Sequence, residues 1–280
     1  MTRPAILRAV AFAGVAAAAI ALTACQSGAT GETAAPASDY VTEGKLTIGT
    51  GEPAYFPWVV DDAPESGEGF EAAVASAVAE ELGFAKEDVV WVRTTFDEAI
   101  APGPKNFDIN LQQFSITDER KQAVDFSSPY YETTQVVVTT EGSKAAGATS
   151  IADLKPLLIG AQTGTTSLTA IEEIIAPDAG AQVFNTNEDA KLALETGQID
   201  AIVLDLPTAF YIAGVELTGG TIVGQLPDSA GGDAFGFVLA KGSPLTAKVT
   251  AAVDALRANG TLAAIEREWL AEFAGAPVLQ

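Results

Sequence analysis

The sequence contains no histidine and a single cysteine among its 280 residues. Without histidine the chain cannot form a Ser-His-Asp triad or a histidine zinc site, and one cysteine cannot close an intrachain disulfide. Basic residues are also scarce, since 15 Lys and Arg stand against 37 Asp and Glu, a formal net charge of −22. Such a chain is repelled by nucleic-acid phosphates and by anionic lipids. We therefore expect no metal, no cofactor and no nucleic-acid partner.

The N-terminus carries an apolar run that is too short to span a membrane. Arg3 and Arg8 lead into the run at 9–22, which falls short of the roughly 18 residues that a transmembrane helix needs. Positive charge, apolar run and small residues in this order are typical of a secretion signal. The run ends in Leu-Thr-Ala-Cys, which resembles the lipobox of bacterial lipoproteins, in which the cysteine is diacylated and becomes the new N-terminus. We predict a lipoprotein signal peptide at 1–24 and lipidation of Cys25, with a free surface thiol as the alternative.

Residues 25–44 are rich in Ser, Gly, Ala, Thr and Pro and lack hydrophobic periodicity. This composition is typical of a flexible tether. A tether between two acyl chains and a globular domain lets the domain reorient at a membrane surface. We therefore expect the protein on the extracytoplasmic face of the cell membrane, anchored through Cys25.

From Lys45 onward, short apolar runs alternate with helical patterns, and the series occurs twice. This order predicts an α/β protein with two units and largely parallel sheets. Leu262, Ile265, Trp269 and Phe273 form one stripe of the last helix, and we expect them in the core. The predicted strands are 45–50, 89–93, 107–111, 134–140, 156–161, 181–184, 200–205 and 233–242, and the predicted helices are 69–83, 165–175, 187–196 and two after Ser243.

Five segments resemble, in order, the extracellular solute-binding proteins of bacterial ABC importers for polar amino acids. The resemblance runs from about Lys45 to the C-terminus. It implies a two-lobed, type II periplasmic-binding-protein fold, with one lobe at 45–133 and 234–280 and the other at 134–233. Two hinge crossings are implied, near 131–136 and 224–233. The segments are IGTGEPAYFPW at 48–58, GFEAAVASAVAEELGF at 69–84, FSITDERKQAVDFSSPYY at 114–131, IGAQTGTTS at 159–167 and GQIDAIVLDLPTAFY at 197–211.

The resemblance implies a receptor that binds a free polar amino acid between its lobes and delivers it to an ABC permease. We expect a monomer that is not an enzyme. Two rivals stay open, because the same fold hosts some dehydratases and cell-wall lyases, and because a sensory lipoprotein would share the same binding site. In open α/β sheets the ligand crevice lies beyond the carboxyl ends of the strands. Four of the segments follow predicted strands, so they should converge on one cleft.

Arg120 is the basic residue that this cleft would use to bind an anion. A guanidinium offers a rigid fork of donors that matches a carboxylate bidentately. By resemblance, Arg120 binds the α-carboxylate of the amino acid and Ser115 adds a hydroxyl donor. The alternative is a solvent-exposed Arg120 paired with Asp118, Glu119 or Asp125.

A zwitterion also needs an anion for its ammonium, and the resemblance assigns that role to Asp205. Its alternative role is the N-cap of the helix that begins with Leu206 and Pro207, because Asp is a good cap there. The two roles are compatible. Thr166 would offer its backbone N–H to the ligand carboxylate at a helix N-terminus, or its loop could be only a tight turn.

Other residues are expected to read the ligand side chain. The resemblance places Glu52 as a side-chain-reading acid, Tyr55 as an aromatic that stacks on the ligand, and Phe96 as the opposite wall. Gln112 and Gln113 depart from the small residues common in relatives, and their amides could read the ligand or simply narrow the pocket.

A charge count suggests the ligand class. Arg120 brings one positive charge, whereas Asp205 and Glu52 bring two negative ones. A zwitterionic backbone leaves Glu52 unpaired, and an unpaired desolvated carboxylate is costly. We therefore expect arginine, lysine or ornithine. The alternative is a neutral ligand such as glutamine, its amide read by Gln112, Gln113 and Gln162.

Overall fold

The computed structural model describes residues 39–227, 233–273 and 275–280. The predicted signal peptide, the lipidation site at Cys25 and most of the predicted tether lie outside the described residues.

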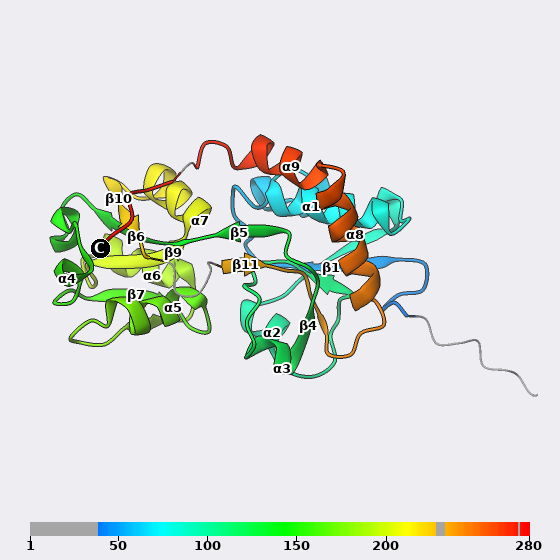
Figure 1. The fold of residues 1–280 in the computed structure, drawn as a ribbon, viewed down its shortest axis with the longest axis horizontal. Helices are drawn as coiled ribbons and strands as arrows, with labels where there is room; N and C mark the ends of the chain where they lie inside the picture. The colour runs from blue at the N-terminus through cyan, green and yellow to red at the C-terminus, as the bar shows by residue number, and fades with distance from the viewer. Residues whose placement is uncertain (1–38, 228–232, 274) are drawn as a thin grey trace, which may run out of the picture. The chain divides into compact units, whose positions relative to one another are not determined.

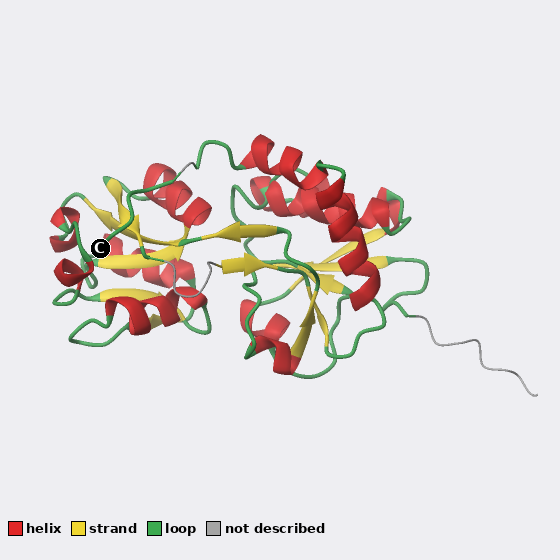
Figure 2. Cartoon of the chain, viewed as in Figure 1, coloured by secondary structure: helices red, strands yellow, loops and turns green. Residues whose placement is uncertain are grey.

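The first lobe is built on a five-stranded mixed sheet with the strand order β2-β1-β3-β12-β4. β1 pairs in parallel with β2 and β3, whereas β12 is antiparallel to β3 and β4. Helices α1, α8 and α9 contact one another, and their apolar side chains share a core with those of β1 (Figures 1 and 2). The elements are β1 Leu46–Thr50, α1 Phe70–Glu81, β2 Val89–Arg93, α2 Phe96–Ile100, β3 Ile109–Asn110, α3 Arg120–Ala123, β4 Val124–Phe126, β12 Val238–Ala240, α8 Thr246–Ala258 and α9 Thr261–Trp269, with short 3-10 turns η1 Val60–Asp62, η2 Pro64–Ser66 and η3 Lys86–Asp88.

The second lobe has its own five-stranded sheet, in the order β10-β6-β9-β7-β8. β7 is parallel to β8 and β9, and β6 is antiparallel to β9 and β10. Two separate apolar clusters pack against this sheet, one with α4 and α5 and the other with α6 and α7. The elements are β6 Gln135–Thr140, η4 Lys144–Gly147, α4 Ile151–Leu154, β7 Ile159–Gln162, α5 Thr166–Ala170, η5 Ile171–Ile175, β8 Gln182–Phe184, α6 Asn187–Glu195, β9 Ala201–Asp205, α7 Leu206–Tyr211, η6 Ile212–Glu216 and β10 Gly220–Gln225, of which η5 and η6 are π-helical turns that continue α5 and α7.

Two chain segments join the lobes as an antiparallel ribbon. β5 (Tyr131–Thr133) pairs with β11 (Asp233–Phe235), and both lie between the two sheets in Figure 1. β5 runs directly into β6, whereas β11 leads into β12. The chain therefore crosses between the lobes at the two places that the sequence resemblance implied.

Two expectations from the sequence were wrong. The sheets are mixed rather than largely parallel, because β6 and β12 each follow a crossing from the other lobe and enter their sheet in the reverse direction. The run 233–242 is not one strand but two, β11 and β12, interrupted at Gly236. A Cβ at Gly236 would lie 2.8 Å from Ile116 Cδ1, so glycine allows the two segments to approach closely there.

The C-terminal residues also differ from the predicted division into lobes. The sequence assigned 234–280 to the first lobe, but the Leu279 N–H donates to the Gln225 carbonyl at 2.8 Å. Leu279 is buried in the core of the second lobe. Its apolar side chain gains more from that core than from solvent, so the chain crosses to the second lobe a further time after α9.

Candidate functional site

A cleft of about 620 Å³ lies between the two lobes, at the carboxyl ends of β1, β3, β7 and β9. The loop segments predicted to converge do line this one cavity. All ten side chains that the sequence suggested as ligand contacts are among its lining residues, namely Glu52, Tyr55, Phe96, Gln112, Gln113, Ser115, Arg120, Gln162, Thr166 and Asp205.

Arg120 is buried within this cleft, with only 9% of its surface exposed. Its Nη1 donates to the Ser115 carbonyl at 2.7 Å, and its Nη2 reaches the other lobe to donate to the Gly164 carbonyl at 2.9 Å. The guanidinium carbon lies 5.3 Å from the centre of the Phe96 ring. Burial lowers the pKa of Arg120, opposed by the charges of Asp233 and Asp205. A guanidinium has five N–H donors, so it retains donors for a bound anion.

The alternative role for Arg120, an exposed surface ion pair, is wrong. Two of the three acids considered as its partners are engaged elsewhere, because Asp118 pairs with Lys121 at 3.0 Å and Asp125 pairs with Lys241 at 3.1 Å. Two carbonyl acceptors hold the guanidinium in place without neutralising it. The cleft therefore contains a fixed, buried positive charge.

Asp205 lies at the first position before α7, but its side chain makes no capping hydrogen bond. Its Oδ1 instead accepts a hydrogen bond from Gln135 Nε2 at 2.8 Å. The same Gln135 nitrogen donates to Asp233, and the Gln135 amide oxygen accepts from Ser167 Oγ at 2.6 Å. Burial, together with the nearby charge of Asp233, raises the pKa of Asp205 to about 8, against the lowering effects of the Gln135 hydrogen bond and of Arg120.

Gln135 and Asp233 were missed by sequence reasoning. Gln135 opens the run Gln-Val-Val-Val-Thr-Thr of β6, where it is buried. A buried amide at the start of an otherwise apolar strand is a signal for a specific polar partner. Asp233 begins β11, one of the two strands of the hinge ribbon, and has no comparable sequence signal.

Glu71 is a second acid that the sequence analysis missed. It is 1% exposed, accepts the Gln113 backbone N–H at 2.8 Å, and also accepts hydrogen bonds from the Gln113 side-chain amide and the Tyr130 hydroxyl. Burial raises the pKa of Glu71 to about 7, against the lowering effect of these hydrogen bonds. Gln113 has φ = +54°, a left-handed conformation that the bonds to Glu71 hold in place. The sequence did contain a signal for its burial, because Glu71 lies on the same face of the predicted helix as Val74 and Val78.

Gln112 is bonded within the first lobe. Its Nε2 donates to Thr94 Oγ1 at 2.7 Å and to Asn110 Oδ1 at 3.1 Å. The nitrogen of Gln113 is likewise bonded to Glu71. Of the two roles considered for these glutamines, narrowing the cavity fits these bonds better than donating to a ligand.

Several side chains bridge the two lobes across the cleft. Ser115 Oγ lies 3.1 Å from Thr166 Oγ1, which also lies 3.2 Å from Asp233 Oδ2. The buried Trp58 Nε1 donates to Thr208 Oγ1 at 2.9 Å. These contacts connect the walls of the cleft directly.

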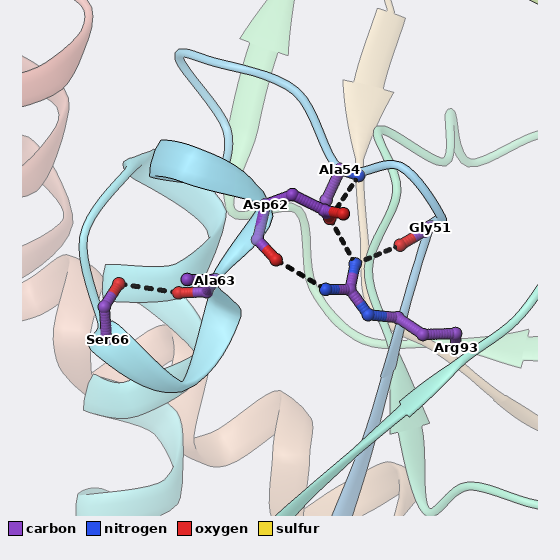
Figure 3. Close-up of polar contacts among 6 residues, drawn as sticks. All are labelled: Gly51, Ala54, Asp62, Ala63, Ser66 and Arg93. Atoms are coloured by element: carbon purple, nitrogen blue, oxygen red, sulfur yellow. Dashed lines mark hydrogen bonds and ion pairs between the residues drawn. The ribbon is translucent and has the colours of Figure 1, made fainter.

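Arg93 holds the loop 51–55, which carries two of the predicted side-chain readers. Its guanidinium donates to the Gly51 carbonyl, to Asp62 Oδ1 and to the Asp62 carbonyl, each at 2.6 Å. Figure 3 shows that the Asp62 carboxylate lies between Arg93 and Ala54, whose N–H it accepts at 2.8 Å. Both ends of the loop are thus tied to the end of β2, which limits its freedom.

Tyr55 and Glu52 have different surroundings on this loop. Glu52 is exposed, whereas Tyr55 is partly buried. Burial raises the pKa of Tyr55, and the charge of Glu188 in the second lobe raises it further. Glu188 lies 3.0 Å from Lys191 Nζ, and the same ammonium lies 2.5 Å from Glu216. Glu188 was not among the residues suggested by the sequence, although it lines the cleft.

The cleft is strongly acidic. Its lining includes one basic side chain, that of Arg120, and a larger set of carboxylates, which are Glu52, Glu71, Asp97, Glu188 and Asp205. In the described part of the chain, no group of three or more metal-ligating acid, cysteine or histidine side chains was found. Within the same ranges no helix is both long and apolar enough to cross a membrane.

Two α/β lobes, a crossed hinge, and a buried arginine and a half-buried aspartate that line one cleft define a two-lobed binding protein for a small solute. The chain belongs to the bacterial extracellular solute-binding proteins, family 3, whose model matches residues 46–272. Its architecture is the type II periplasmic-binding-protein fold expected from the sequence.

Individual relatives are similar over most of their length. The chain is 33% identical over 226 residues to the L-arginine-binding protein of Pseudomonas aeruginosa, covering 78% of this chain and 85% of the relative. It is 28% identical over 218 residues to the ABC transporter glutamine-binding protein GlnH of Bacillus subtilis, covering 75% and 76%. Among solved structures, an ancestral arginine-binding protein bound to arginine is 31% identical, with a TM-score of 0.67, over 81% of this chain and 98% of that one.

Proposed function

We propose that this protein is a receptor that binds a free cationic amino acid between its lobes and delivers it to an ABC permease. The observation that carries the proposal is the charge of the cleft. Arg120 is buried and bonded only to carbonyls, so it is available for the ligand α-carboxylate. Asp205 faces the same cavity and suits the ligand ammonium.

A cationic side chain suits the remaining acids better than a neutral one. Once Arg120 and Asp205 are used by the zwitterion, Glu52, Asp97 and Glu188 still line the cavity. Closing the lobes over these carboxylates without a counter-charge is costly, because desolvation disfavours an unpaired charge. The two arginine-binding relatives described above agree with this choice. Glutamate and aspartate should be rejected, since a second carboxylate would meet like charge.

The competing ligand is a neutral polar amino acid such as glutamine, which the Bacillus subtilis relative is named for. Gln162 offers the best support for it, because it lines the cavity and its side-chain hydrogen bond, from the Asn187 N–H to Oε1 at 3.1 Å, uses only the amide oxygen. The amide nitrogens of Gln112 and Gln113 are bonded within the first lobe, which weakens this alternative.

A catalytic role is not favoured by the arrangement of the acids. An enzyme of this fold would need a carboxyl that exchanges protons with its substrate near neutral pH. Glu71 has a raised pKa, but both of its oxygens already accept hydrogen bonds from Gln113, and one also accepts from Tyr130. The other raised carboxyl, Asp205, is used by the ammonium of the ligand in this proposal.

The test is a calorimetric titration of the purified protein with the common amino acids. Arginine, lysine or ornithine should bind most tightly. A ligand at 100 times its dissociation constant should add about 2.7 kcal/mol to the free energy of unfolding, which thermal-shift measurements detect. Tight binding of glutamate with no response to arginine or lysine would contradict the charge argument.

The lipid anchor is a separate proposal and rests on the sequence alone. Two acyl chains on Cys25 would hold the receptor beside its permease and on the extracytoplasmic face of the membrane. Replacing Cys25 with Ser should move the protein from the membrane fraction to the soluble fraction. Unchanged membrane fractionation in cells that lack the permease would contradict the anchor.

A further inference from the structure

We propose that Glu188 is the residue of the second lobe that selects a cationic ligand side chain. This inference rests on the proposed function, because it takes an amino acid held by Arg120 and Asp205 as its starting point. The sequence resemblance suggested Glu52 of the first lobe as the acid that reads the ligand side chain. The structure provides a carboxylate on the opposite wall of the same cavity.

The acids that line the cleft differ in how free they are to meet a ligand. Glu71 lines the cavity, but it is 1% exposed and its oxygens are occupied by Gln113 and Tyr130. Asp205 is committed to the ligand ammonium. Glu52 and Asp97, both of the first lobe, are exposed, so solvent weakens their attraction for a cation. Glu188 is half-buried, and it is the carboxylate that α6 presents to the cleft.

Glu188 is positioned by neighbouring residues of the second lobe. It lies in the first turn of α6, where Thr186 caps the helix through a hydrogen bond to the Asp189 N–H at 3.1 Å. Lys191, one turn later, lies 3.0 Å from Glu188 Oε2 and 2.5 Å from Glu216. Because Lys191 is shared with the closer Glu216, it orients Glu188 without fully neutralising it. The pair Glu188 and Glu216 therefore keeps one negative charge in excess over Lys191.

An aromatic side chain of the first lobe, that of Tyr55, lines the same cavity as Glu188. The charge of Glu188 contributes to the raised pKa of the Tyr55 hydroxyl. An extended side chain that stacks on Tyr55 would bring its cationic end to Glu188. That contact would join the two lobes through the ligand, so a cationic ligand would stabilise the closed arrangement more than a neutral one of the same length.

The experiment compares arginine with glutamine in calorimetric titrations of the full-length protein and its Glu188→Gln variant. We expect the variant to bind arginine at least tenfold more weakly, while its affinity for glutamine changes less than twofold. Glu195→Gln is the matched control, because Glu195 ends the same helix, is exposed and lies outside the cleft. It should leave both affinities unchanged. Equal thermal unfolding of the three proteins would show that the fold is retained.

The outcomes separate the two proposals. If the unmodified protein prefers arginine and Glu188→Gln keeps that preference, the role of Glu188 is refuted while the proposed function stands. If the unmodified protein binds glutamine but neither arginine nor lysine, the cationic specificity and the role of Glu188 are both refuted. Loss of arginine and glutamine binding to the same extent would assign Glu188 to the structure of the cleft and would also refute selection.

Discussion

Ligand binding should release a proton from Asp205. In the free protein, burial and the neighbouring Asp233 raise the pKa of this carboxyl to about 8, so near neutral pH it is largely protonated. A ligand ammonium needs the ionised carboxylate and stabilises it, which lowers the pKa in the complex. Affinity should therefore fall as the pH falls below 8 and level off above it.

The size of the effect follows from the pKa. With a free-state pKa of about 8 and a much lower pKa in the complex, the apparent dissociation constant rises about tenfold for each pH unit below 8. Between pH 8 and pH 6 this amounts to roughly 50-fold, and at pH 7 about 0.9 proton should leave per ligand bound. The charged and titratable groups facing Asp205 are Asp233, Arg120 and Glu71.

The assay is calorimetry at pH 7 in buffers that differ in their heat of ionisation. The observed enthalpy should change with buffer in proportion to the protons released, and arginine suits the test because its α-ammonium stays charged in this range. The contribution of Asp205 to the free energy of unfolding should depend on pH in the opposite direction to the affinity. A folded-state pKa above the unfolded one means that the contribution of Asp205 to stability is full below about pH 4 and is lost as the pH rises through 8. Weaker binding at pH 6 would thus not reflect unfolding caused by this group.

Two results would refute the reasoning. An affinity that is constant from pH 6 to pH 8, with no buffer dependence of the enthalpy, would show that Asp205 is ionised before the ligand arrives. A proton release that persists in Asp205→Asn would assign the proton elsewhere. Glu71, whose pKa is about 7, is the main candidate for that outcome, and Glu71→Gln would identify it.

Three further predictions concern single side chains. Arg120→Ala should abolish measurable amino-acid binding in calorimetry, because removing one partner of a desolvated charge pair costs ~2–5 kcal/mol. Trp58→Phe should weaken binding about fivefold, since it removes the 2.9 Å hydrogen bond from Trp58 Nε1 to Thr208 across the lobes, worth about 1 kcal/mol. Gly49→Ala should lower the free energy of unfolding by ~1–3 kcal/mol in denaturant titrations, because its Cβ would lie 2.2 Å from Asn110 Nδ2.

Each of these predictions has a control. The Arg120→Ala protein should still unfold cooperatively, and near-native affinity in it would remove the arginine from the site. A Trp58→Phe protein with unchanged affinity would show that the Thr208 bond does not distinguish free from bound protein. Gly214→Ala is the partner of Gly49→Ala, because nothing lies within 4 Å of a Cβ at Gly214, and this variant should be nearly neutral. Equal destabilisation by both substitutions would contradict the steric argument.

Much of the fold could be predicted because its signals are local. The helix α1 follows from the spacing of Phe70, Val74 and Val78, and it ends where Gly83 adopts φ = +87°. The break at Gly236 could not be predicted from the apolar pattern of 233–242, because its cause is the close approach of Ile116 from a distant part of the chain. Strand direction was missed for the same reason, since only the crossings between lobes reverse β6 and β12.

In the candidate site, too, some features could be predicted from the sequence and others could not. Loops that follow strands could be placed in one cleft from the order of elements, and the ten suggested residues do line it. The hydrogen-bond partners could not be predicted, because they join residues distant in sequence, such as Gln135 with Asp233 and Glu71 with Gln113. Sequence also suggested a cap for Asp205, where the structure has a bond to Gln135 instead.

The C-terminal tail changes the mechanics of the hinge. Gln225 of β10 is bonded to the tail on both sides, through its N–H to the Pro277 carbonyl and through its carbonyl to the Leu279 N–H, each at 2.8 Å. In Figure 1 the chain from α9 reaches the second lobe well apart from β5 and β11. Two adjacent strands alone would allow the lobes both to bend and to twist, whereas a third attachment away from that axis resists twisting. The lobes should therefore rotate mainly about one axis. The two walls of the cleft should then meet in the same alignment at each closure.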